Sequence, residues 1–175
     1  ALSISAVTII IAFLGPVLGN IADNKGMKKI FFTTVVSVGV ICCIINGFTT
    51  SWLLFLLLYI VTRICYNAAN AIYDSMLNDI TSEERMDEVS SYGYAWGYII
   101  PFLVALIAYV LGPDMVGVIS ASLSKQIGCI VTALWWAIVT LPLLKNYEQL
   151  FYTEKKEHAI RNSFKEIGHT LKTIA

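Results

Sequence analysis

Four polar residues with helical spacing are the part of this sequence best suited to do chemistry. They stand at positions i, i+4, i+7 and i+11 of an apolar run, and they are Arg63, Asn67, Asn70 and Asp74. A helix places all four on one face. An ionised side chain in such a run needs a partner or water. We therefore expect Arg63 and the two asparagines to line a cavity and contact a solute or a coupling carboxylate. The alternatives are a structural arginine bonded to nearby carbonyls and an interfacial Asp74.

A charged turn over residues 19–29 is the second such feature. It carries an acid, two glycines and a basic pair, at Gly19, Asp23, Gly26, Lys28 and Lys29. Gly19 allows close helix approach, and Gly26 can take the positive φ of a tight reversal. We expect the two lysines to anchor the turn in an anionic lipid leaflet. Long apolar runs flank the turn, so it must lie at a membrane surface. A solvated turn with no further role is the alternative.

A pair of glycines and a proline form the third feature. Gly93 and Gly97 have the G-x-x-x-G spacing that lets two membrane helices approach closely. Pro101 removes a backbone hydrogen bond and is expected to kink its helix. Periodicity does not decide whether the aromatic residues around these positions line a cavity or contact lipid: Tyr94, Trp96 and Tyr98.

The composition indicates the element that must position these residues. Hydrophobic residues make up 57% of the chain and charged residues only 14%, whereas soluble domains are about 45–50% apolar. The chain is therefore an all-α, multi-pass integral membrane protein whose surroundings are the lipid bilayer. No sequence pattern indicates a metal or another cofactor, and no basic run is dense enough to indicate nucleic acid binding.

Five apolar runs are long enough to cross a bilayer as helices. They cover approximately residues 2–21, 30–48, 51–77, 89–111 and 127–144. Residues 112–126 are expected to form a connection. In the tail, residues 145–175, apolar side chains recur at intervals of three and four, which predicts an amphipathic helix.

The distribution of lysine and arginine predicts the orientation. Ten of them lie on the side that holds loops 22–29 and 78–88 and the tail 145–175, and the other side holds only Lys125. Because positive residues concentrate on the inner face of membranes, these three segments are expected to be cytoplasmic.

The pattern G-x-x-x-D-x-x-G-x-K-K of residues 19–29 resembles the signature loop of the major facilitator superfamily. The resemblance implies a polytopic helical bundle that is part of a twelve-helix fold, with these five spans as helices two to six. The first helix and the C-terminal half would then be partners outside this chain, and the tail would link the halves. It also implies that Asp23 latches one half to the other. Asn24 departs from the family, which usually has Arg or Lys there.

Two further segments carry the resemblance. Residues 63–66 are similar to the Arg-containing motif of the fourth facilitator helix, although Asn67 replaces the expected glycine. Residues 73–98 resemble the vacuole effluxer-like branch, which is related to autophagy-associated amino-acid effluxers.

These features together predict a secondary active transporter of a small solute, with amino acids implied by the resemblance and a coupling ion left open. A bacterial plasma membrane is the expected location. The alternative functions are a non-transporting scaffold or an oligomeric channel. A membrane-embedded enzyme is disfavoured because the predicted spans contain no histidine to pair with a nucleophile.

Overall fold

The computed structural model describes residues 7, 8, 11, 15, 22, 24–113 and 115–151. Most of the predicted first span, Gly19, Asp23 and residues 152–175 of the tail lie outside the described residues. The roles expected for these parts therefore stay predictions.

The described part of the chain is helical. The helices are α2 (Met27–Phe48), α3 (Trp52–Ile80), the short 3₁₀ helix η1 (Glu83–Arg85), α4 (Met86–Leu111) and α5 (Ala121–Asn146). The four α-helices are each long and apolar enough to cross a membrane. A membrane favours helices because they satisfy every backbone polar group within the segment.

Several helices extend beyond the predicted apolar runs. Helix α3 continues through Ile80, so the predicted loop at 78–88 shrinks to Thr81, Ser82 and the single turn of η1. Helix α5 begins at Ala121, six residues before the predicted run, because its first turn is polar and apolarity alone does not detect it. The side chain of Ser120 caps this first turn by accepting a hydrogen bond from the Leu123 amide at 3.2 Å.

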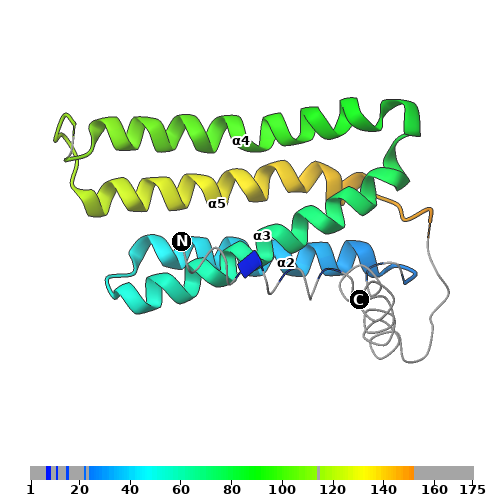
Figure 1. Cartoon of the computed structure of the whole chain (residues 1–175), viewed down its shortest axis with the longest axis horizontal. Coiled ribbons are helices and arrows are strands. Elements are labelled where there is room, and N and C mark those ends of the chain that lie inside the picture. Colours follow the sequence, from blue (N-terminus) through cyan, green and yellow to red (C-terminus); the bar gives the residue numbers. More distant parts are fainter. Residues whose placement is uncertain are drawn as a thin grey trace, which may run out of the picture.

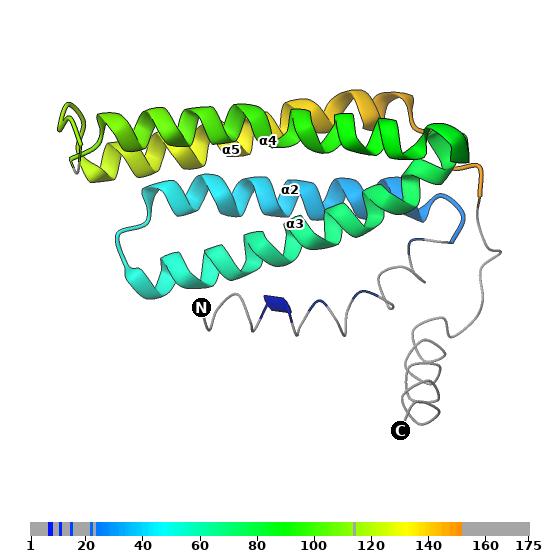
Figure 2. The ribbon, with the colours of Figure 1, turned by 45° about the horizontal axis from the view of Figure 1, so that its top comes forward.

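The helices form two packed pairs (Figures 1 and 2). Helix α2 lies between α3 and α5, and α4 packs along α5. We call the end where α2 and α4 begin and α3 and α5 end the charged end. The buried cluster lies between α2 and α3 toward this end and includes Phe32, Val36, Ala69, Ile72 and Met76.

Helix α4 presents a mostly apolar surface to its surroundings. Ala108 is its only buried residue, while Phe102 is 66% and Ile107 is 57% exposed. Large apolar side chains this exposed suit contact with lipid or with further helices. The helix runs without interruption from Met86 to Leu111 through Pro101.

Close contacts between helices occur at Gly93 of the predicted pair and at Gly39, a glycine outside that pair. A Cβ on Gly39 of α2 would lie 2.6 Å from the ring of Trp136 on α5 and 3.1 Å from Cys65 on α3. A Cβ on Gly93 would overlap the Tyr73 hydroxyl, so Gly93 makes room for a side chain of α3. Gly97 has no described atom within 4 Å of such a Cβ, and its packing role stays a prediction.

Gly39 and Gly97 give a matched pair for testing this packing. We expect Gly39→Ala to lower the free energy of unfolding by about 1–3 kcal/mol, because the Trp136 ring must move. Gly97→Ala, which meets open space, should leave stability unchanged or slightly raise it. Thermal unfolding of both variants in one detergent would measure the difference, and equal transitions would contradict the packing described.

Candidate functional site

The predicted polar stripe lies on α3, and its residues differ in the groups that they contact. Arg63 and Asn70 are half-buried. The Asn67 amide donates to the Arg63 backbone carbonyl at 2.8 Å, so part of its polarity is used within the helix. Asp74 is exposed and accepts a hydrogen bond from the Tyr94 hydroxyl of α4 at 3.1 Å. The stripe therefore faces toward α4 at its Asp74 end.

Arg63 differs from the other residues of the stripe because its described partner is an aromatic ring. Its guanidinium carbon lies 5.6 Å from the centre of the Tyr66 ring, a cation–π contact. Among the described residues, no carboxylate lies within ion-pair distance of Arg63. Arg63 is eleven residues into α3, which puts it roughly 16 Å along the helix and near the middle of a bilayer core of about 30 Å.

Four tyrosines join the stripe to α4. Tyr66 and Tyr98 pair through their hydroxyls. The Tyr94 ring packs edge-on against Tyr73 at 6.0 Å and stacks with Tyr98 at 6.4 Å. The result is an aromatic surface between α3 and α4 with Arg63 at one end and Asp74 at the other.

Sequence reasoning missed most of this surface although its spacing was visible. Tyr66 and Tyr73 lie at i+3 and i+10 from Arg63, on the same helical face as the stripe. Tyr94 and Tyr98 stand four residues apart on the next helix, so they too share a face. Charged and amide side chains alone define the predicted stripe, and periodicity leaves Tyr94 and Tyr98 undecided.

A buried carboxylate at the charged end is the second cluster. The side chain of Asp79 is fully buried at the end of α3. Its Oδ2 atom accepts hydrogen bonds from Lys28 Nζ of α2 at 3.0 Å and from the Tyr147 hydroxyl at 2.6 Å. Its Oδ1 atom accepts from the backbone amides of Leu150 at 3.2 Å and Phe151 at 2.8 Å. Four donors satisfy the four acceptor positions of an ionised carboxylate.

Tyr147 remains a hydrogen-bond donor in this cluster. Burial, together with the hydrogen bond to the Asp79 carboxylate, raises the pKa of Tyr147 above its ordinary value. Its hydroxyl therefore stays protonated at neutral pH and continues to bond Asp79.

The position of Lys28 corrects one expectation. Lys28 was expected to anchor the charged turn in the lipid leaflet, but it is only 4% exposed and pairs with Asp79. Its Nζ also donates to the Ser75 carbonyl at 3.3 Å. Lys29 is exposed, as an anchoring residue must be, and Gly26 has a φ of +74°. The expectation failed for Lys28 because its acid partner was assigned to a loop rather than to the buried face of α3.

Asp79 itself could have been found. It stands three residues after Met76 and seven after Ile72, both fully buried, so it lies on the buried face of α3. An acid there needs a cation, and the charged turn supplies several lysines.

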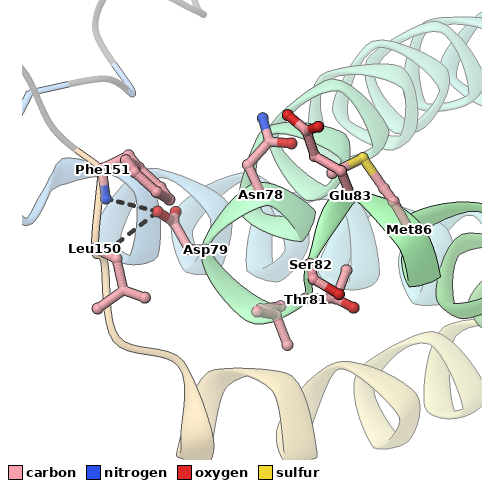
Figure 3. A pocket seen from close by; sticks show the side chains of 9 residues that line it. Asn78, Asp79, Thr81, Ser82, Glu83, Met86, Leu150 and Phe151 are labelled. Carbon is pink, nitrogen blue, oxygen red and sulfur yellow. Dashed lines mark hydrogen bonds between the residues drawn. The ribbon is translucent and has the colours of Figure 1, made fainter.

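A cavity of about 620 Å³ adjoins this cluster at the charged end (Figure 3). Its lining comes from the end of α3, from η1, from the start of α4 and from the segment after α5: Asn78, Asp79, Ile80, Thr81, Ser82, Glu83, Met86, Leu150 and Phe151. In Figure 3 the Leu150 and Phe151 amides bond to Asp79 on one side, and Asn78 and Glu83 point toward one another on the other. Within the described ranges, no group of three or more His, Cys, Asp or Glu could hold a metal ion.

Lys28 and Lys29 provide a test of the buried pair. Lys28→Met leaves the Asp79 carboxylate buried without its cation, and we expect a loss of about 3–5 kcal/mol in unfolding free energy. The neighbouring Lys29→Met alters an exposed residue and should change stability by less than about 0.5 kcal/mol. Thermal unfolding in detergent measures both. The double change Lys28→Met with Asp79→Asn should recover much of the loss, and no recovery would contradict a charge-pair origin.

Comparison with known proteins identifies the group to which this architecture belongs. The sequence profile of the Major Facilitator Superfamily matches residues 1–173. An uncharacterized MFS-type transporter, YxiO of Bacillus subtilis (strain 168), is 41% identical over 177 residues, an alignment that covers 98% of this chain. The chain spans about two-fifths of the length of that relative. No solved structure matches the chain significantly. With four membrane-length helices and a profile match over nearly its whole length, the chain belongs to the major facilitator superfamily.

Proposed function

We propose that this chain is part of a secondary active transporter that moves a small solute by alternating access, with amino acids as the favoured substrates. The observation that carries the proposal is Arg63, a half-buried cation near the middle of α3 whose described partner is the Tyr66 ring. A cation at that depth has a high free-energy cost unless it faces a partner or water, and such residues commonly mark a solute pathway. The family and the MFS-type relative support transport in general.

The chemistry around Arg63 favours a solute that carries both a carboxylate and an ammonium group. The planar guanidinium matches a carboxylate and can hold it with two hydrogen bonds. The stacked rings of Tyr94 and Tyr98 offer faces that attract an ammonium group. Asp74 adds a negative charge at the far end of the same surface.

The wider assignments belong to the same proposal. The resemblance of residues 73–98 supports the vacuole effluxer-like branch, and the lysine and arginine distribution supports a cytoplasmic charged end. A bacterial plasma membrane, a first helix and a C-terminal half complete the proposed transporter. The signature loop, with Gly26, Lys28 and Lys29, would act at the cytoplasmic gate together with Gly19 and Asp23.

The test is counterflow of labelled amino acids in liposomes that contain the full-length protein. Arg63→Ala should lower the rate roughly ten- to hundredfold, because a hydrogen bond to a charged group is worth about 1.5–3 kcal/mol. Arg63→Lys keeps the charge but loses the planar fork, so we expect an intermediate rate. Lys145→Ala, which removes an exposed cation at the charged end, is the matched control and should transport normally.

A substrate comparison in the same liposomes tests the proposed chemistry. An amine that lacks the carboxylate should compete poorly with the parent amino acid in the wild type, and Arg63→Ala should abolish that preference. Wild-type transport rates in Arg63→Ala would reject the role of Arg63. Downhill flux without counterflow would instead indicate a channel.

A further inference from the structure

The segment that follows α5 is bound to the rest of the charged end by an unusual set of hydrogen bonds. We call residues 147–151 the strap. Its Tyr147 hydroxyl and two of its backbone amides, those of Leu150 and Phe151, bond to the buried Asp79 carboxylate. Leu150 and Phe151 are themselves 63% and 66% exposed, so burial of their side chains does not hold the strap. The strap is therefore fixed to α3 by its hydrogen bonds to one carboxylate and by the ring of Tyr147, which is 5% exposed and belongs to the buried cluster.

Gln149 of the strap makes a second connection, to the signature loop. Its Oε1 atom accepts a hydrogen bond from the Gly26 amide at 2.8 Å, and its Nε2 atom donates to the Asn24 carbonyl at 3.3 Å. A further bond from Nε2 to the Phe151 carbonyl, at 3.3 Å, holds the side chain in place. Gly26 is the residue before the first turn of α2, where backbone amides have no partner within the helix. Gln149 supplies such a partner from 123 residues away.

Asp79 also connects the strap with the signature loop, in this case through α3. Lys28, at the start of α2, bonds to Asp79 and to the Ser75 carbonyl, so the loop is tied to α3. The strap is tied to α3 through the other bonds of Asp79. The loop, α3 and the strap are thus joined pairwise. Lys28 joins the loop to α3, Asp79 joins α3 to the strap, and Gln149 joins the strap to the loop.

We infer that the strap fixes the position of the signature loop through Asp79 and Gln149, so that the chain leaving this half of the transporter controls the cytoplasmic gate. The inference rests on the proposed transport function. The strap is the first part of the tail that the sequence predicts as the linker between halves. Gln149 lies within five residues of the end of α5 and bonds to Gly26. A displacement of that linker would therefore be transmitted through Gln149 to Gly26. In this scheme Asp79, Tyr147 and Gln149 are positioning residues and do not touch the solute.

The experiment measures hydrogen–deuterium exchange of single backbone amides in the full-length protein, and each variant is read at amides whose own hydrogen bond it leaves in place. Tyr147→Phe removes one bond to Asp79 and leaves Gln149 intact, and we expect the exchange rate of the Gly26 amide to rise at least fivefold. Gln149→Ala leaves Asp79 intact, and the Leu150 and Phe151 amides should exchange at least fivefold faster. Glu148→Ala, at the exposed position between them, is the matched control and should change neither rate.

Transport by the same variants supplies a second readout. Gln149→Ala should change the maximum counterflow rate per folded molecule and leave the half-saturating substrate concentration unchanged, because Arg63 and the tyrosines are untouched. Exchange that rises only at amides whose own bond was removed would overturn the inference, as would equal effects of Glu148→Ala and Gln149→Ala. The exchange measurement needs no transport, so a wild type without counterflow would reject the proposed function and leave the strap to be judged by exchange alone.

Discussion

The buried carboxylate of Asp79 is the interaction on which the charged end depends. An ion removed from water is stable only when partners satisfy it, and the cost of leaving it alone is large. Asp79 obtains its four donors from two segments that are distant in sequence: the start of α2 and the strap that follows α5. The need to satisfy one side chain thus fixes how three parts of the chain meet.

The polar surface between α3 and α4 is organised differently. Asp79 is saturated by donors, whereas the described surroundings of Arg63 offer it an aromatic ring. Asp74 is exposed and has one phenol as its described partner. A saturated ion suits a fixed joint, because any change costs several bonds. An ion with few partners suits recognition, because a solute can add to its contacts. If the proposed function holds, the two clusters on α3 divide rigidity and binding between opposite faces of one helix.

The sequence predicted the helical membrane fold and the polar stripe, because apolar length and helical spacing are local properties. It did not predict Asp79, the burial of Lys28 or the role of Tyr147, because these depend on which helix ends meet. The close contact at Gly39 was also missed: Gly39 lacks a paired motif, and only the position of Trp136 reveals why it is small. The tyrosines of the aromatic surface could have been predicted. Tyr66 and Tyr73 share the helical face of the stripe, and Tyr94 and Tyr98 stand four residues apart on the next helix.

The hydrogen bonds of the strap have a consequence for sequence variation. Leu150 and Phe151 bind Asp79 through backbone amides that every residue except proline possesses. Their side chains are mostly exposed, so these two positions can vary widely in apolar or polar character, provided that proline is absent. Tyr147 and Gln149 contribute side chains and have no such freedom. Related transporters that keep this joint should conserve the residue types at positions 147 and 149 and vary at positions 150 and 151, in a segment whose composition alone resembles an ordinary linker.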